Sequence, residues 1–298
     1  MERDSFIIHV FCLVAERYQQ IIATQPLRRG GFAPELRDEE VITMEICGEF
    51  FKLGTDKDLF AYFYSHYRHF FPRLQNRSLF VRQAANLWAV KAEIQRQLVC
   101  LSGQDQDPVQ PIDTLPLPVC VYTRAARDQC FPTEADWGYC AAKERHYYGF
   151  KLGLRVSRIG MITHFPLLAA RPHDINHLDT LVEGFCGIAP ADKGFIDAFR
   201  QQQLTDRHGI TVVTPTRARM APPAHAPALM IACRRWRKLV ETVGSHLTER
   251  FGVARIRVHD RWHYQHRLIR KVLAHTVGVF LNLQLQRPPL DLDGLLAV

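Results

Sequence analysis

The chain has 298 residues, of which 47% are hydrophobic and 23% charged, as in ordinary globular proteins, and this length suits one large domain or two smaller ones. No uninterrupted apolar run reaches the roughly 18 to 20 residues of a membrane-spanning helix, and the opening Met1-Glu-Arg-Asp lacks the basic-then-apolar order of a signal peptide. The eight cysteines form no Cys-x-x-Cys pair. We therefore expect reduced thiols in a cytoplasmic protein rather than a zinc ribbon or a disulfide framework.

The first hundred residues predict helices only. Residues 4–22 have helical length and no internal breaker, and Asp38 is suited to cap a helix over 39–51. Further helices are expected over 57–70 and 78–101, where apolar residues recur near helical spacing. Helix-turn-helix DNA readers and dimerisation domains share such a pattern, which favours neither.

The pattern changes after the polar segment 104–108, which predicts a boundary between a helical domain, residues 1–104, and a second domain, residues 105–298. Strands are expected over 109–112, 147–156, 161–169, 188–192 and 210–214, and helices over 174–185, with Asp174 as N-cap, 195–208 and 228–251. Pro116 and Pro118 should end the first strand at or just after Asp113, because proline donates no hydrogen bond to a sheet. This order predicts an α/β fold with a mixed sheet and helices packed on it.

Basic residues are concentrated late in the chain. Residues 217–271 contain 13 Lys and Arg against 3 Asp and Glu, a balance of +10, whereas the whole chain has a net charge of +8. Trp236, Trp262 and Tyr264 are interleaved with them. A solvated face is the ordinary explanation of a charge run, but this concentration favours a polyanion such as nucleic acid as the partner.

Carboxylates fall on separate elements of the second domain. Asp113 is expected near the end of the first strand, Asp192 at the end of the fourth, and Glu241 on the last long helix, with Glu249 as the alternative. Such oxygen ligands suit Mg²⁺, and two Mg²⁺ ions can activate a water and stabilise the leaving oxygen of a phosphodiester. Lone acids are common, and capping a turn would explain Asp113 alone. The order of the elements that carry the acids strengthens the hypothesis.

Other site chemistries have less support. His173 and His177 are four residues apart, as in some zinc pairs, but no third ligand is in view. A glycine-rich phosphate loop and a Gly-x-Ser-x-Gly elbow are absent from the sequence. Their absence argues against nucleotide-driven and serine-hydrolase chemistry.

Motifs along nearly the whole chain resemble the IS982 family of insertion-sequence transposases. The run Ile112–Cys120 (IDTLPLPVC), followed by Arg124 and Arg127, resembles the first acidic motif of that family. The run Ala191–Ile196 (ADKGFI) resembles the second acidic motif. The helix that bears the third acid in the family is similar to the segment with Arg237, Lys238, Glu241 and Thr242. Further similar segments are Leu74–Arg82, Gly138–Cys140, Lys143 and Tyr148–Leu152.

The resemblance implies a ribonuclease H-like catalytic domain with a mixed five-stranded sheet and Asp113, Asp192 and Glu241 as its acidic triad. In that family the triad holds two Mg²⁺ ions, for which Mn²⁺ can substitute, and Asp113 would bridge both. Such enzymes cut double-stranded DNA at transposon ends and join the freed 3′ hydroxyl to target DNA. We expect a homodimer on DNA, because two ends must be brought together, in the cytoplasm and associated with the nucleoid.

Cations that the motifs and the helix pattern bring near the acids are expected to contact DNA. They are Arg124, Arg127, Lys143, Lys151, Lys193, Arg217, Arg219, Arg234, Arg237 and Lys238. The chain departs from the tyrosine-arginine-glutamate-lysine signature of the related IS4 group, with Arg234 and Thr248 in the tyrosine and lysine places. Two alternatives stay open: a catalytically inactive DNA-binding relic or repressor, and a ribonuclease H-like nuclease without strand joining.

Overall fold

A computed structural model describes residues 1–28, 30, 33–120, 122–127, 130–140, 144–216 and 226–296. The chain forms two compact units, which we call the helical unit (residues 1–101 with 249–298) and the sheet unit (residues 102–248). The sequence placed residues 249–298 in the second domain, whereas the structure groups them with the N-terminal helices.

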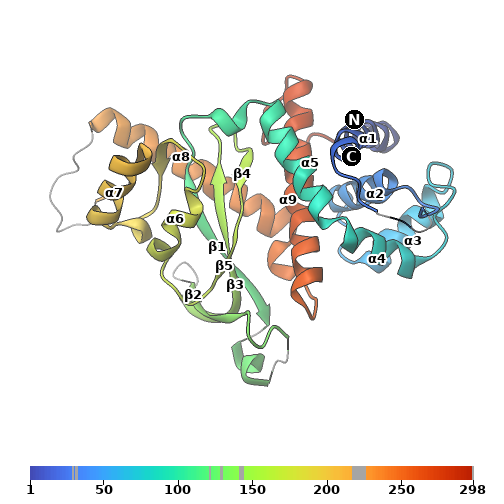
Figure 1. Cartoon of the computed structure of the whole chain (residues 1–298), viewed down its shortest axis with the longest axis horizontal. Helices are drawn as coiled ribbons and strands as arrows, with labels where there is room; N and C mark the ends of the chain where they lie inside the picture. Colours follow the sequence, from blue (N-terminus) through green and yellow to red (C-terminus); the bar gives the residue numbers. More distant parts are fainter. Residues whose placement is uncertain are drawn as a thin grey trace. The chain divides into compact units, whose positions relative to one another are not determined.

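The described part of the helical unit consists of helices and their connections (Figure 1). The helices are α1 (Arg3–Thr24), α2 (Asp38–Phe50), α3 (Asp56–His66), α4 (Arg77–Asn86), α5 (Trp88–Leu101) and α9 (Arg261–Gln284). The single helix expected over 78–101 is interrupted at Leu87, which separates α4 from α5. Asn76 caps α4 by accepting hydrogen bonds from two backbone N–H groups. Asp38 is the first residue of α2 rather than its cap.

The helix α9 lies at the centre of the helical unit, and the sequence reading missed it. Nearly every residue from Tyr264 to Asn282 is buried, and α9 packs against α5 and α2 (Figure 1). Gly278 allows this close packing, because a Cβ atom there would lie 2.8 Å from the Phe50 ring and closer still to Leu292. Polar residues such as Arg270 and Lys271 are buried together with the apolar ones, so the first turns of α9 look like a solvated charge run in the sequence.

A buried group of charges joins α2, α3, α5 and α9, and we call it the helical ion cluster. Its members are Glu45, Glu49, Asp56, Lys91, Arg270 and Lys271. The Lys91 ammonium lies 2.7 Å from Glu45, and Lys271 lies 2.8 Å from Glu49. Arg270 donates to Glu49 at 2.6 Å and to Asp56 at 2.8 Å. Two cations of the late basic segment are therefore used inside the fold rather than offered to a polyanion.

By length and composition, α1 could cross a membrane, although the sequence reading found no such segment. In the structure, 39% of its apolar window is buried. Phe6, Val10 and Val14 are fully buried, and α1 packs on α2. A core helix near a chain end passes the same test of length and hydropathy, so the helix is weak evidence for a membrane span.

The sheet unit contains a five-stranded antiparallel sheet and a separate pair of parallel strands. The strands are β1 (Ile112–Cys120), β2 (Asp136–Cys140), β3 (Arg145–Val156), β4 (Ile162–His164), β5 (Leu167–Ala169), β6 (Gly187–Pro190) and β7 (Ile210–Val213). Along one edge β3 pairs with β1, and along the other it pairs in succession with β2, β5 and β4. An isolated parallel bridge between Val109 and Ile188 links the chain entering β1 to β6.

The expectation that β1 ends near Asp113 was wrong. The strand continues to Cys120, with Pro116 opposite Lys151 and Pro118 opposite Gly149. In the described residues, this stretch of β1 pairs with β3 alone, so the missing proline N–H groups can face the unpaired edge. Asp113 is therefore the second residue of β1 rather than its last.

The helices of the sheet unit are α6 (Leu178–Leu181), α7 (Ala198–His208) and α8 (Pro227–Ser245), and a π-helical turn, His246–Arg250, follows α8. α7 ends at Gly209 in the left-handed conformation (φ 65°), as predicted. α8 runs across β1 (Figure 1), where a Cβ atom on Gly244 would lie 3.0 Å from Leu115. The helix expected over 174–185 is shorter: a 3₁₀ turn, Asp174–His177, which Asp174 begins rather than caps, leads into α6, which ends at Leu181.

Candidate active site

Asp113 is held at the start of β1 by its neighbours. Ile112 is buried in the core formed with α6, β6, β7 and α7, and Asp113 lies opposite Leu154 of β3. The half-buried Asp113 carboxylate accepts a hydrogen bond from the backbone N–H of Thr114 at 2.7 Å. Because both flanking residues belong to a paired strand, the direction of this carboxylate is set by the sheet.

Asp192 follows β6, where the chain is anchored on both sides. The N–H of buried Ala191 donates to the carbonyl of Val213 at 2.9 Å, which continues the β6–β7 pairing by one residue. Phe195, also buried, donates its N–H to the Asp192 carbonyl at 3.1 Å and closes a tight turn. The Asp192 side chain is thereby presented at the surface of the sheet unit, 51% exposed.

Arg237 on α8 brings two of the predicted acids together. Its Nη2 lies 3.0 Å from Asp192 Oδ1 and 3.2 Å from Glu241 Oε1, so the two oxygens are no farther apart than the sum of these distances. Glu241 is one turn after Arg237, and the buried neighbours Val240 and Val243 fix that face of α8 toward the sheet. Glu249, the alternative acid, has no such link and lies in the π-helical turn after α8.

The pKa of Asp113 shows that this third predicted acid is influenced by the other two. Burial, together with the negative charges of Asp192, Asp174 and Glu241, raises the pKa of this carboxyl to about 7, against the lowering effect of the Thr114 hydrogen bond. Charges act on a carboxyl in this way only when they are close to it. The three predicted acids thus share one electrostatic environment, although they are far apart in the sequence.

Asp174 is a fourth acid at this place, and the sequence reading did not assign it to the site. Its Oδ1 accepts hydrogen bonds from Thr114 Oγ1 at 2.8 Å and from Lys151 Nζ at 2.9 Å. An aspartate before a helix looks like an N-cap in sequence, so no local signal distinguishes this role. Asp174 ties the strand that carries Asp113 to the segment that follows β5.

The donor set suits a hard divalent cation. Asp113, Asp192 and Glu241 offer carboxylate oxygens, and burial is the main cause of the raised pKa of Asp113, with the negative charges of Asp192, Asp174 and Glu241 adding to it. Among the residues that the structure describes, no three His, Cys, Asp or Glu side chains are arranged so that they could hold one metal ion. In this arrangement, Arg237 supplies the positive charge between Asp192 and Glu241.

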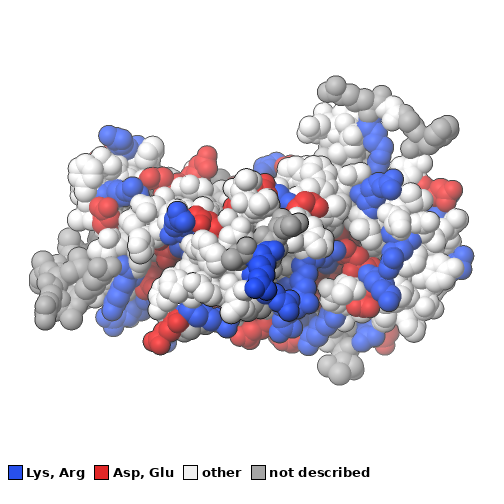
Figure 2. Space-filling model, turned by 90° about the horizontal axis from the view of Figure 1, so that it is seen from below, with Lys and Arg blue, Asp and Glu red and all other residues white. Residues whose placement is uncertain are grey.

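The cations predicted to contact DNA differ in placement. Those exposed at the surface are Arg124, Arg127, Lys193, Arg234 and Lys238. Lys151 is buried, and its ammonium donates to the Pro172 carbonyl at 2.7 Å as well as to Asp174, so it holds that carboxylate instead of facing solvent. Lys143, Arg217 and Arg219 lie outside the described residues. Figure 2 shows Lys and Arg interspersed with Asp and Glu on the face it presents.

The same part of the chain is similar to a known family. The family model described as the transposase DDE domain matches residues 103–261, more than half of the chain, and this range contains Asp113, Asp192 and Glu241. No curated protein and no solved structure matched the chain. DNA is the substrate that such a domain implies, and its enzymes generally use divalent metals. The match covers more than half of the chain and includes β1 with Asp113, β6 with the following Asp192, and α8 with Glu241. We therefore conclude that the chain belongs to the transposase DDE domain family.

Proposed function

We propose that this protein is an insertion-sequence transposase of the IS982 type, which binds terminal inverted repeats and catalyses strand cleavage and strand transfer with Asp113, Asp192 and Glu241. One observation carries the proposal. Arg237 bridges Asp192 and Glu241, and the charges of both act on Asp113, so acids from three separate elements influence one another electrostatically. A carboxyl whose pKa is raised by burial and by neighbouring charges, as that of Asp113 is, is typical of a functional site.

The strand order supports a ribonuclease H-like arrangement. β5, β3 and β1 are neighbours in the antiparallel sheet, and the Val109–Ile188 bridge places β6 next to the chain entering β1, with β7 beyond it. Asp113 then lies at the start of β1, Asp192 follows β6, and α8, which carries Glu241, packs against both strands. This placement explains how acids with wide sequence spacing converge.

Asp113, Asp192 and Glu241 are the residues that would hold Mg²⁺, or Mn²⁺ in its place, as two ions. When bound, such ions activate a water and stabilise the leaving oxygen of a phosphodiester. The protein's own part is positioning: Lys151 and Thr114 hold Asp174 beside Asp113, and Arg237 holds Asp192 and Glu241 on one side of α8. The ionised form of Asp113 is the ligand form, so its raised pKa makes cation binding weaker as pH falls below about 7.

The surrounding cations would bind the DNA backbone. Arg234 and Lys238 are exposed one turn apart on α8, the helix that carries Glu241, and Lys193 follows Asp192 directly. Positive charges beside the acids would hold phosphates near the reacting bond. We further propose that the helical unit contributes DNA binding or dimerisation, that the enzyme acts as a homodimer on two ends, and that it works in the cytoplasm at the nucleoid.

The decisive experiment measures Mg²⁺-dependent cleavage of a duplex that carries the element's terminal repeats. Asp113→Asn, Asp192→Asn and Glu241→Gln should each abolish strand cleavage while end binding is kept, because each removes a ligand charge but not a DNA contact. Asp179→Asn, an exposed acid on α6, is the matched control and should cleave at the wild-type rate. A triad variant that cleaves at the wild-type rate would remove that residue from the site.

The same assay separates the alternatives. A wild-type protein that binds the ends but never nicks them with Mg²⁺ or Mn²⁺ is a DNA-binding relic or repressor. A protein that nicks but yields no joined product is a nuclease without strand transfer. Recovery of a strand-transfer product with the wild type, and with no triad variant, is the result that the transposase assignment requires.

A further inference from the structure

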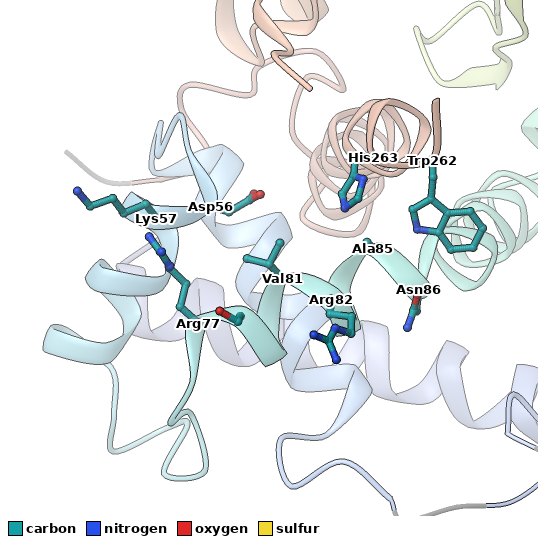
Figure 3. Close-up of a pocket in the computed structure, with 10 residues that line it drawn as sticks. Asp56, Lys57, Arg77, Val81, Arg82, Ala85, Asn86, Trp262 and His263 are labelled. Carbon is teal, nitrogen blue, oxygen red and sulfur yellow. The ribbon is translucent and has the colours of Figure 1, made fainter. Parts of the chain in front are cut away.

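The helical unit contains a pocket that no expected function uses. It has a volume of about 550 Å³, within the roughly 300–1,000 Å³ typical of ligand sites, and lies between the start of α3, the length of α4 and the start of α9 (Figure 3). Its walls carry both cations and an aromatic ring. The lining residues that matter here are Lys57, Arg77, Val81, Arg82, Asn86 and Trp262.

Trp262 gives the pocket an exposed flat surface. Its side chain is 47% exposed although tryptophan is a residue that proteins usually bury. Trp88 packs against it edge to face, with ring centroids 5.9 Å apart and the planes at 76°, which holds the indole in place. A ring that is fixed by one neighbour and open to solvent is suited to stack on another planar group.

The cations of the pocket are available to an outside anion. Lys57, Arg77 and Arg82 are exposed, and within the described part of the chain none of them forms an ion pair. Asp56, the acid among the lining residues, accepts from Arg270 at 2.8 Å and also pairs with Arg267, so its charge is already neutralised. The pocket therefore has an excess of positive charge without a partner in its own wall.

Two of the three cations lie at the opposite end of the pocket from the indole, and Arg82 lies between. Figure 3 shows Lys57 and Arg77 close together at one end, Trp262 and Asn86 at the other, and Val81 and Ala85 between them. A nucleotide has the same order: an anionic phosphate, a sugar, and a planar base with hydrogen-bonding edges. Aromatic stacking beside a positive groove is how proteins hold unpaired bases without reading sequence.

We infer that this pocket binds one unpaired nucleotide of a DNA strand, with its phosphate at Lys57 and Arg77 and its base stacked on Trp262 and within reach of the Asn86 amide. The inference rests on the proposed function for the choice of DNA as ligand. It adds a site, outside the acidic triad, that distinguishes a single strand from an intact duplex. A strand opened at a transposon end would supply such a nucleotide.

The test is equilibrium binding of the full-length protein, measured by fluorescence anisotropy in metal-free buffer with labelled oligothymidylate and, separately, a blunt duplex. Trp262→Ala should lower the affinity for the single strand about 5- to 100-fold and change duplex affinity less than about 2-fold. Trp262→Phe keeps a ring, so its loss should be smaller. Retained duplex binding shows that the variants are folded.

Matched controls come from the same unit. Leu79→Ala removes an exposed apolar side chain of α4 outside the pocket, and Arg73→Ala removes an exposed cation outside it. Arg77→Ala should weaken the single-strand complex more than Arg73→Ala does and lower its salt dependence by about one phosphate contact. Equal single-strand affinity of Trp262→Ala and Leu79→Ala, or no binding of the single strand by the wild type, would overturn the inference.

The outcome of this binding test is independent of the outcome of the cleavage test of the triad. Binding is measured without metal and with Asp113, Asp192 and Glu241 intact, so a cleavage-negative protein can still show the pocket. Conversely, an active transposase whose Trp262→Ala variant binds single strands normally would keep the proposed function and lose the nucleotide pocket.

Discussion

Two groups of acids in this protein are surrounded by very different amounts of positive charge. In the helical ion cluster, Glu45, Glu49 and Asp56 have side chains between 0% and 11% exposed, and each is paired with a buried or nearly buried cation. In the sheet unit, Asp192 and Glu241 are 51% and 55% exposed and share the guanidinium of Arg237. The acids of the first group are buried with their own cations, whereas the two carboxylates of the second are exposed to solvent.

The pKa values of Asp56 and Asp113 are shifted in opposite directions. Opposite charges from Arg270 and Arg267 lower the pKa of Asp56 against the raising effect of its burial. Burial and like charges together raise the pKa of Asp113 to about 7. Neighbouring charges thus act in opposite directions on Asp56 and Asp113, whereas burial raises the pKa of both and is also the main cause of the raised pKa of Glu45 in the helical ion cluster.

The largest effect is expected from breaking the helical ion cluster. Lys91→Met removes a fully buried cation and leaves Glu45 without its closest partner, so it should lower the free energy of unfolding by about 3 to 5 kcal/mol. The double variant Lys91→Met/Glu45→Met removes both charges and should recover most of that loss. Chemical denaturation of the three proteins is the measurement. Equal stability of the single variant and the wild type would show that the pair is not buried in solution.

The pH dependence of stability tests the raised pKa of Asp113. Its folded pKa is above its usual value of 3.8, so the neutral carboxyl stabilises the fold fully below about pH 4, and this contribution is lost as pH rises to about 7. Asp113→Asn has no such titration. In metal-free buffer the variant should therefore gain stability relative to the wild type, by a few kcal/mol at most, between pH 4 and pH 7.5. Parallel curves for the two proteins would contradict the raised pKa.

An intermediate effect is expected at Asp174. Asp174→Ala leaves the Lys151 ammonium, whose side chain is 10% exposed, with only the Pro172 carbonyl, which should cost roughly 1 to 3 kcal/mol of stability. Asp174→Asn keeps an acceptor and should cost less. Both variants should also lower the pKa of Asp113, because one of the charges that raise it is removed. Thermal unfolding at several pH values measures both consequences, and an unchanged Asp174→Ala protein would remove Asp174 from the site.

The smallest effect on stability is expected at Arg237. Arg237→Gln breaks two largely exposed ion pairs and should cost no more than about 1 kcal/mol. The loss of the guanidinium leaves Asp192 and Glu241 uncompensated, so Mg²⁺ should raise the melting temperature of the variant more than that of the wild type. Arg235→Gln, an exposed neighbour on α8, is the matched control. An Mg²⁺ effect equal to that of the control would mean that Arg237 does not compete with the cation.

Local patterns in the sequence predicted most of the elements around these groups. The helices α1, α2 and α7 and the strands β3, β6 and β7 lie within a few residues of their expected ranges, since each has clear periodicity or a clear cap. The course of β1 through Pro116 and Pro118 was not predictable, because it depends on which edge of the strand is left unpaired. α9 was missed because its buried cations, such as Arg270 and Lys271, look like surface residues until their partners are known.

The candidate site was predictable only in part. Motif resemblance singled out Asp113, Asp192 and Glu241, whereas the meeting of these acids depends on long-range pairing of β1, β6 and α8. Nothing local marks Asp174 as their neighbour or Lys151 as its partner, since both roles arise from contacts across the sheet. Motif resemblance thus singled out the acids, and tertiary structure decides which side chains share a charge environment.

The difference between the acids of the sheet unit and those of the helical ion cluster is tested most directly by a Mn²⁺ titration of the full-length protein, followed by electron paramagnetic resonance. We expect the wild type to bind Mn²⁺ and Asp113→Asn, Asp192→Asn and Glu241→Gln each to weaken that binding strongly, while Glu49→Gln, in the charge-balanced helical ion cluster, leaves it unchanged. Mn²⁺ binding that is the same in the wild type and in all three sheet-unit variants would contradict a shared cation site.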